Sequence, residues 1–294
     1  MHMRENEPLS AHTTFRIGGP AKYYLVPESK AEVREGLAFA NEKNLPWLVI
    51  GKGSNLLVPD EGYSGVVIEI GKGMEKIEVE TGETDGRICA QAGVSLGVLA
   101  AAAAKESLTG LEFASGIPGT LGGAVTMNAG AYDGEMKDVI VSATVLDKSG
   151  EERTLSREQL QLGYRSSRIQ REGSLVLEAV FELQKGNREV ILEKMRELNG
   201  RRRDKQPLEY PSAGSTFKRP EGYFAGKLIQ DAGLRGFRIG DAQVSEKHCG
   251  FVINRGNATA ADVRCLIKEV QKRVQESSGV WLEPEVKMIQ PEKE

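Results

Sequence analysis

The segment "SGIPGTLGGAVTMNAGAY", residues 115–132, runs for eighteen residues without a charged side chain and is rich in glycine and other small residues. Ordering so many conformationally free positions is costly unless the segment packs against another surface. A large flat cofactor would supply that surface, with N–H groups of residues 117–123 facing a pyrophosphate. The alternative is a structural loop against the core, because glycine also serves turns that bind nothing.

A second glycine loop, "VIGKGSNLLV" (49–58), follows the buried-strand pattern of Trp47–Ile50. Its glycines allow a tight turn whose N–H groups converge on an anion. A Rossmann fingerprint would need a third glycine at the start of a helix, but Leu56 occupies that place and a strand-like run follows. The loop therefore indicates either an anion-binding turn or a plain β-turn, and not a nicotinamide-binding Rossmann motif.

Composition limits the class of protein. The chain has 294 residues, 39% hydrophobic and 28% charged, with a net charge of −3, which is typical of a globular protein with two domains. The charge balance argues against nucleic-acid binding. No apolar run has the length of a signal peptide or a membrane span, and three cysteines are too few for a disulfide framework or a zinc site. We expect a cytoplasmic protein without a metal.

Hydrophobic periodicity predicts an α+β fold in two parts of unequal size. Capping boxes at Ser29–Glu32 and Thr259–Asp262 mark two helix starts. The residues 204–220 are rich in Pro, Gly and Ser and predict a domain junction. Helices are predicted at 30–44, 95–105, 187–203, 223–232 and from 260 onward, and strands at 47–50, 66–70, 76–80, 88–92, 141–146, 175–183, 250–254 and 280–289.

The motif "SAGSTFKRP" (212–220) places Ser215 after a glycine and close to Lys218 and Arg219. A serine in this setting is a turn residue, a phosphate ligand or a proton donor. A free serine hydroxyl is a poor acid, so the third role requires a strongly basic carbanion beside it and a cation that stabilises the alkoxide.

Six short motifs occur in one order along nearly the whole chain: "TTFRIGG" (13–19), "GKGSNLLV" (51–58), residues 115–136, "LGYRSSR" (162–168), "AGSTFKRP" (213–220) and "WLEPEV" (281–286). In this order they resemble the UDP-N-acetylenolpyruvoylglucosamine reductase family. The junction after Arg168 is short, so the chain is similar to the branch that lacks an extra tyrosine-bearing loop.

The resemblance implies a two-lobed FAD-binding module of the vanillyl-alcohol-oxidase/PCMH type over residues 1–205, with lobes of about 1–70 and 71–205. A smaller α+β substrate domain would cover 206–283, and the tail 284–294 would return to the first lobe. The FAD is expected to be noncovalent, because none of the histidines lies in a glycine loop. The cofactor-binding residues would be Gly51, Gly53, Ser54, Asn55, Ser115, Ile117, Pro118, Gly119, Gly122, Gly123 and Asn128.

The family reaction has two halves. NADPH gives hydride to the flavin, and hydride then passes to C3 of the enolpyruvyl ether while C2 receives a proton, which yields UDP-N-acetylmuramate for peptidoglycan. The resemblance makes Arg165 the cation facing the substrate carboxylate, with Arg168 as a surface alternative. It makes Ser215 the proton donor and Glu285 the catalytic glutamate. Glu283 shares the strand face of Glu285 and competes with it.

A basic cluster at the junction is either the solvated end of a helix or a grip on a diphosphate. The resemblance favours the second role, chiefly for Lys205. The substrate-binding residues it implies are Tyr164, Arg201, Lys205, Lys218, Arg219 and Asn254. Two other functions remain open: an FAD-linked oxidase or dehydrogenase of the same fold acting on a hydroxy acid or a sugar alcohol, and a non-catalytic nucleotide-sugar binding module. No nucleic acid, membrane or obligate protein partner is expected.

Overall fold

The computed structural model describes residues 2–290 and divides into two compact units, each described by itself. The first unit holds Tyr24–Lys52, Gly65–Arg202 and the described residues up to Arg4. The second holds Glu5–Tyr23, Gly53–Ser64 and the described residues from Arg203 onward. The expected α+β class is confirmed, since helices and mostly antiparallel strands alternate in both units.

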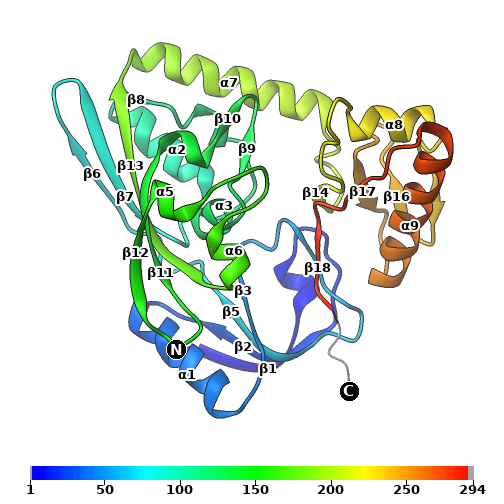
Figure 1. Cartoon of the computed structure of the whole chain (residues 1–294), viewed down its shortest axis with the longest axis horizontal. Coiled ribbons are helices and arrows are strands. Elements are labelled where there is room, and N and C mark those ends of the chain that lie inside the picture. The colour runs from blue at the N-terminus through cyan, green and yellow to red at the C-terminus, as the bar shows by residue number, and fades with distance from the viewer. Residues whose placement is uncertain (1, 291–294) are drawn as a thin grey trace. The chain divides into compact units, whose positions relative to one another are not determined.

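A six-stranded sheet organises the first unit, with the order β12-β11-β13-β7-β6 and β8 paired to the end of β13 (Figure 1). In the central strand β13, buried residues alternate with less buried ones, and Glu178 and Glu182 lie on the more exposed face, as the alternation predicts. The strands are β6 (Ile77–Thr81), β7 (Asp85–Gln91), β8 (Leu108–Thr109), β11 (Ile140–Leu146), β12 (Glu152–Ser156) and β13 (Leu175–Lys185).

Helices and small strands complete this unit. Helix α3 packs against β13, and Ser29 caps α1 by accepting the N–H of Glu32. A further sheet has the order β1-β2-β5-β3. The helices are α1 (Lys30–Glu42), α2 (Leu96–Lys105), η2 (Glu112–Ala114), α3 (Leu121–Thr126), α4 (Met136–Val139), α5 (Arg157–Leu160), α6 (Arg168–Glu172) and α7 (Arg188–Lys205). The remaining strands of this unit are β3 (Trp47–Ile50), β9 (Gly130–Ala131) and β10 (Gly134–Glu135), whereas β1 (His2–Pro8), β2 (Pro20–Val26) and β5 (Tyr63–Glu69) have residues assigned to both units.

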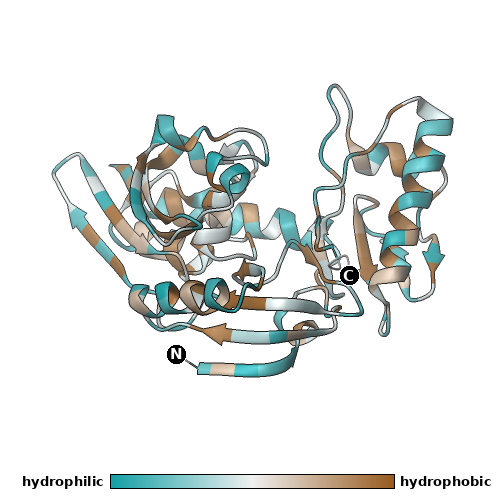
Figure 2. Ribbon diagram, turned by 60° about the horizontal axis from the view of Figure 1, so that its bottom comes forward, coloured by the Kyte–Doolittle hydropathy of each residue, from teal (hydrophilic) through white to brown (hydrophobic). Residues whose placement is uncertain are grey.

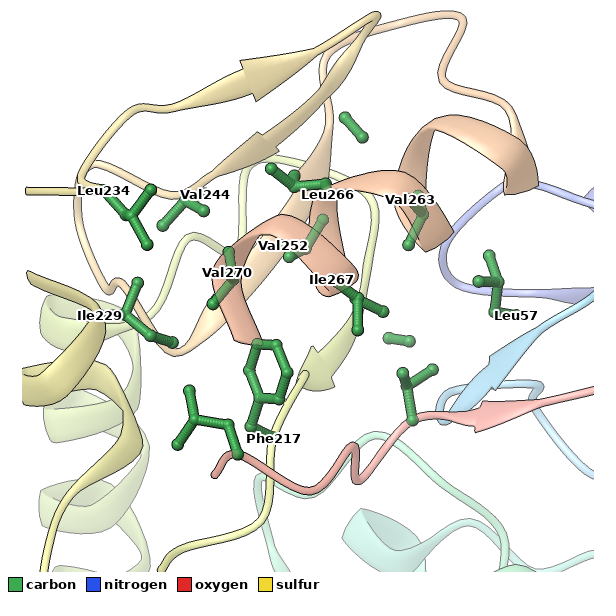
Figure 3. Close-up of a cluster of buried hydrophobic side chains, with 14 of the residues drawn as sticks. Leu57, Phe217, Ile229, Leu234, Val244, Val252, Val263, Leu266, Ile267 and Val270 are labelled. Atoms are coloured by element: carbon green, nitrogen blue, oxygen red, sulfur yellow. The ribbon is translucent and has the colours of Figure 1, made fainter. Parts of the chain in front are cut away.

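The second unit is built on the four-stranded sheet β14-β17-β16-β15, against which α9 packs. Helix α9 has one apolar and one polar side, visible as brown and teal in Figure 2. Its buried residues meet Val252 and Leu234 in the cluster of Figure 3. The elements are η1 (Leu9–His12), β4 (Leu56–Leu57), β14 (Ser212–Ser215), α8 (Ala225–Asp231), β15 (Arg238–Ile239), β16 (Ala242–Val244), β17 (Phe251–Asn254), α9 (Ala260–Ser278) and β18 (Lys287–Met288).

Two side chains fix the start of α9. The predicted capping box is present, with Thr259 accepting the N–H of Asp262 and Asp262 accepting the N–H of Thr259. The carboxylate of Asp60 also accepts the N–H groups of Ala260 and Ala261, at 2.7 and 3.0 Å. Acidic groups at this end are favoured by the helix dipole.

The expected final strand over 280–289 is wrong for most of its length. Only Lys287–Met288 form a strand, β18, which pairs in parallel with β4. Pro284 stands in the middle of the expected strand, where its missing N–H prevents a continuous ladder. Residues 291–294 of the expected returning tail lie outside the described residues. No helix in the range 2–290 combines the length and apolarity that crossing a bilayer demands.

The cluster around α9 generates a stability prediction. Leu266 is fully buried, whereas Lys268, two residues later, is exposed. We expect Leu266→Ala to lower the free energy of unfolding by about 2–5 kcal/mol, because it removes buried methyl groups and leaves a cavity. The control Lys268→Ala should change it by no more than about 0.5 kcal/mol. Urea unfolding followed by circular dichroism checks both, and equal effects would contradict the packing described.

Candidate functional site

The two glycine loops meet within the first unit. A Cβ atom added to Gly51 would lie 2.1 Å from Oγ1 of Thr120, so only glycine fits at position 51. Thr120 is buried and precedes α3, and its neighbour Gly119 accepts the N–H of Leu96 through its carbonyl group. The pattern of small residues therefore serves close backbone packing between the two loops.

Several N–H groups expected to face a pyrophosphate are already used. Ile117 donates to Ala114, Leu121 to Val94 at 2.8 Å and Gly122 to Ala92 at 2.8 Å, all to backbone carbonyls. The hydroxyl of Ser115 donates to the carbonyl of Glu112. An anion at this segment must be met by other groups, which corrects the expectation that all N–H groups of 117–123 face it.

Arg202 is a residue that the sequence analysis missed. It lies in α7 beside Gly116, where an added Cβ would come within 2.2 Å of Asn199 Oδ1 and 3.3 Å of Arg202 Nε. The Nε atom is buried and has no hydrogen-bond partner among residues 2–290. Burial lowers the pKa of the Arg202 guanidinium, against the opposing effect of Tyr132.

The position of Arg202 in the sequence could have identified it as a candidate site residue. It follows Leu198 by four residues and so continues the apolar stripe of α7, where a cation is out of place. A buried guanidinium nitrogen without a partner is costly in a finished protein core. Its place against the glycine segment 115–123 fits a bound group with acceptor atoms, such as the FAD expected there.

Asn128, which the resemblance assigns to the cofactor, is used by the chain itself. It is 0% exposed. Its amide nitrogen donates to Glu135 at 2.9 Å and to the carbonyl of Gly163 at 3.0 Å, and its oxygen accepts the N–H of Lys137. Asn128 therefore positions the 163–166 turn.

The turn 163–166 carries Tyr164 and Arg165 at its tip, since Gly163 and Ser166 exchange both backbone hydrogen bonds. Arg165 has a φ of +52°, at the third position of the turn, where type II turns take glycine. Its guanidinium stacks 5.1 Å from the ring centre of exposed Tyr164 and donates to the carbonyl of Gly130. A strained arginine in a glycine position is typical of functional sites.

Arg201 lies close to the glycine segment 115–132 as well. Its guanidinium is 4.9 Å from the ring centre of Tyr132 and 3.5 Å from the carboxylate of Glu197. Tyr132 and Asp133 form the turn of the β9–β10 hairpin, and both have positive φ angles, as a type I′ turn requires.

In the second unit, a bulge exposes the hydroxyl of Ser215. The pairing of β14 with β17 shifts register between Ser212 and Ser215, and Gly214 between them has a φ of +75°. The next residue, Thr216, is buried and accepts the N–H of Val252 through its hydroxyl. Ser215 itself is exposed, and its Oγ makes no hydrogen bond within residues 2–290. The bulge thus re-aims this serine outward.

Glu285 is held directly beside this serine. Its N–H donates to the carbonyl of Thr216 at 2.8 Å, and its carbonyl accepts from the amide of Asn55 at 3.1 Å. The N–H of Lys287 returns a bond to the carbonyl of Asn55 at 2.9 Å. Asn55 of the glycine loop 49–58, Ser215 and Glu285 are therefore neighbours in one unit.

The same unit separates the two competing glutamates. Glu283 has its side chain 65% exposed and forms a salt bridge with Lys218. The backbone ties them too, since the N–H of Lys218 donates to the carbonyl of Glu283. Glu285 is half-buried beside Thr216 and is thus the better placed carboxylate. The guanidinium of Arg219 stacks 4.1 Å from the ring centre of Phe224, which is 62% exposed.

Asn254, which the resemblance assigns to the substrate, is used by the chain itself. It is 3% exposed, donates to the carbonyl of Phe15 and accepts the N–H groups of Gly256 and Ala258. Gly53 also serves packing: an added Cβ would lie 2.2 Å from the carbonyl oxygen of His12. Ser54, which follows it, is half-buried, and Lys205 at the end of α7 is exposed.

Chemically, the second unit presents the exposed hydroxyl of Ser215, which could deliver a proton. The first unit presents the guanidinium of Arg165, which could pair with a carboxylate, and it holds the buried Nε atom of Arg202 without a partner among residues 2–290 near the glycine segment 115–132.

Comparison with known proteins assigns both parts of the chain. The family profile described as the C-terminal domain of UDP-N-acetylenolpyruvoylglucosamine reductase matches residues 206–289, and an FAD binding domain profile matches residues 21–156. The reductase of that name from Lachnoclostridium phytofermentans is 59% identical over 284 residues, which cover 97% of this chain and 92% of that protein. The one from Clostridium tetani is 50% identical over 292 residues, covering 99% and 94%.

A solved structure agrees. The crystal structure of UDP-N-acetylenolpyruvylglucosamine reductase (MurB) from Thermus caldophilus superimposes with a TM-score of 0.83 at 36% identity, covering 98% of this chain and 99% of that one. The expected fold, an FAD-binding domain followed by a smaller α+β domain, is confirmed. The chain belongs to the UDP-N-acetylenolpyruvoylglucosamine reductase family.

Proposed function

We propose that the protein uses NADPH to reduce the enolpyruvyl ether of UDP-N-acetylglucosamine to UDP-N-acetylmuramate, with hydride delivered to C3 and a proton to C2. Family membership supports this reaction. The observation that carries the residue assignment is the exposed hydroxyl of Ser215, held one residue from the Thr216–Glu285 hydrogen bond. An FAD-linked oxidase acting on alcohols would have no use for a proton donor placed in this way.

The FAD would be held by a vanillyl-alcohol-oxidase/PCMH-type module within residues 1–205. Its contacts would come from the glycine loops, namely Gly51, Gly53, Ser54, Asn55, Ser115, Ile117, Pro118, Gly119, Gly122 and Gly123, without Asn128. Arg202 joins this set because its buried Nε lies against Gly116 without a partner. When bound, FAD accepts hydride from NADPH and passes it to the substrate. No histidine lies in either loop, which favours noncovalent binding.

Three residues would act on the substrate. Arg165 would pair with the substrate carboxylate, where two parallel N–H bonds match two oxygens. Its stacking on Tyr164 holds the guanidinium ready before the substrate arrives. Glu285 would act as a protonated carboxylic acid, whose O–H donates a hydrogen bond to the enolate-like charge that develops at C2 and on the substrate carboxylate. Ser215 would deliver its proton to C2, and the ammonium of Lys218 would stabilise the resulting alkoxide.

The domain formed by residues 206–283 would bind the nucleotide portion of the substrate. Lys205 is the diphosphate ligand in this proposal, supported by Arg201 and Arg219 with Lys218 nearby. Arg219 already stacks on exposed Phe224, so the pair offers a planar surface to the substrate. The absence of an obligate protein partner and the cytoplasmic location stay predictions.

The reaction is tested by spectroscopy on the purified protein. We expect a yellow protein whose flavin absorbance is bleached by NADPH under anaerobic conditions and returns only when the enolpyruvyl nucleotide is added. A colourless protein that cannot be loaded with FAD would refute the enzymatic proposal. Recolouring by a keto acid or an aldehyde, and not by the nucleotide, would instead support an alcohol or hydroxy-acid dehydrogenase.

Replacement of the proton donor should separate the two half-reactions. We expect Ser215→Ala to leave bleaching by NADPH intact and to slow the nucleotide half-reaction on the order of 10²–10⁴-fold, the usual value of a positioned acid. Ser212→Ala, in the same strand, is the matched control and should change neither rate more than about threefold. Stopped-flow absorbance measures both steps, and equal loss in both would exclude the role given to Ser215.

The backbone of Arg165 gives a second, independent prediction. Both Arg165→Ala and Arg165→Gly should lose most of the nucleotide half-reaction, because each removes the guanidinium. Their stabilities should differ, since only glycine adopts a φ of +52° without strain. We expect the glycine variant to be more stable than the alanine variant by about 1 kcal/mol. Thermal unfolding compares them, and an alanine variant of equal or higher stability would show that the turn is not strained.

A further inference from the structure

His248 lies in a fixed position in the second unit, although neither the family motifs nor the sequence analysis gave it a role. An added Cβ at Gly250 would lie 2.9 Å from Cε1 of His248, and one at Gly226 would lie 3.4 Å from it. The ring of Phe251 packs against the imidazole edge to face, with the ring centroids 5.2 Å apart. Two glycines and one aromatic ring therefore hold the imidazole in place.

A hydrogen bond sets the tautomer of this histidine. Nδ1 of His248 accepts the N–H of Gly250 at 3.1 Å, so in the neutral ring the proton resides on Nε2. Among residues 2–290, Nε2 makes no hydrogen bond. This atom is also accessible to solvent. His248 thus offers one N–H donor that the chain itself does not use.

The charge next to His248 is positive. Burial lowers the pKa of His248, and the cation of Lys205 lowers it further, against an opposing backbone hydrogen bond. The imidazole is therefore neutral near pH 7 and still donates from Nε2. Lys205 is exposed and forms no salt bridge within the described chain.

The loop that carries His248 is tied to the helix end that carries Lys205. The ammonium of Lys247 donates to the carbonyl of Arg203 in the last turn of α7 at 2.7 Å and lies 3.9 Å from Glu209. The hydroxyl of Ser245 accepts the N–H groups of both Lys247 and His248 at 3.2 Å. These bonds fix the donor and the unpaired ammonium in one small region before any ligand binds.

We propose that His248 is a substrate-binding residue that donates its Nε2–H to the diphosphate of the nucleotide substrate, alongside Lys205. The inference rests on the proposed function, because that function supplies the diphosphate. A neutral donor next to an unpaired cation suits a phosphate oxygen, since the donor adds a directional bond to the attraction between opposite charges. Packing between Gly226 and Gly250 gives that bond its direction.

The test uses two replacements of His248 that each keep one half of the imidazole. Asparagine keeps an acceptor near Nδ1 for the N–H of Gly250 and removes the outer donor. Glutamine keeps a donor near Nε2 and loses that acceptor. UDP is the probe, its affinity for the FAD-loaded protein is measured by calorimetry, and Lys205→Met serves as the reference variant.

We expect His248→Asn to weaken UDP binding about 10- to 100-fold, which is the value of a hydrogen bond to a charged group. His248→Gln should stay within about fivefold of the parent. Lys205→Met should weaken binding at least tenfold. The FAD content and the unfolding temperature of each variant are measured in parallel, and a folded, FAD-loaded asparagine variant with weakened UDP binding supports the proposal.

Two results would overturn the inference. The first is that the His248→Asn variant binds UDP as tightly as the parent while the Lys205→Met variant binds it more weakly. In that case the diphosphate site exists but does not include His248. The second is equal loss in the asparagine and glutamine variants, which would reduce the ring to a packing role. If the parent protein binds no UDP at all and Lys205→Met changes nothing, the proposed function fails, and that outcome is distinct from the other two.

Discussion

Two hydrogen bonds to the backbone of Glu285, from its N–H to Thr216 and to its carbonyl from Asn55, join three segments that are far apart in the sequence. Asn55 and Glu285 are separated by 230 residues. Each bond contributes only about 1 kcal/mol to stability, but together they decide which side chains become neighbours. These bonds hold Thr216, Asn55 and Glu285 together, and Ser215 directly precedes Thr216, so the proposed proton delivery depends on that arrangement.

Buried amides do a different job from the groups at the site. Asn128 and Asn254 were both assigned to binding by the resemblance, but every hydrogen bond on their side chains goes to the chain itself. A buried amide whose nitrogen and oxygen both bond to the chain has little left to offer a ligand. What it does is to fix a loop: Asn128 holds the turn that carries Arg165, and Asn254 holds residues 15 and 256–258. The distinction between a ligand and the residue that positions it rests on where the hydrogen bonds end.

The periodic parts of the fold could be predicted from the sequence. Helix α9, with its capping box and apolar stripe, and strand β13, with its alternating burial, follow their patterns closely. The single strand expected after Gly279 was wrong, although Pro284 argues against it, and the partners of this tail, Thr216 and Asn55, could not be predicted because they are distant in sequence. The site was also predictable only in part. The motifs pointed to Ser215, Arg165 and Glu285, but a sequence motif does not show whether a backbone N–H group is already hydrogen-bonded within the chain, as that of Gly122 is. Arg202 could have been identified from the sequence, because it interrupts the apolar stripe of α7.

The unfavourable features of the chain collect where the proposed chemistry needs them. Arg165 holds a left-handed backbone conformation that costs on the order of 1–2 kcal/mol, and Arg202 buries a guanidinium nitrogen without a partner. Against a total stability of about 5–15 kcal/mol, two such positions are a considerable burden. Glycine at 165 would relieve the backbone strain, and an apolar residue at 202 would remove the unpaired Nε atom. Their presence is reasonable if a ligand completes the arrangement, since a bound carboxylate would engage the first cation and a bound cofactor the second. Strain and unmet hydrogen bonds are therefore more informative about this site than its glycines, most of which the fold requires for its own packing.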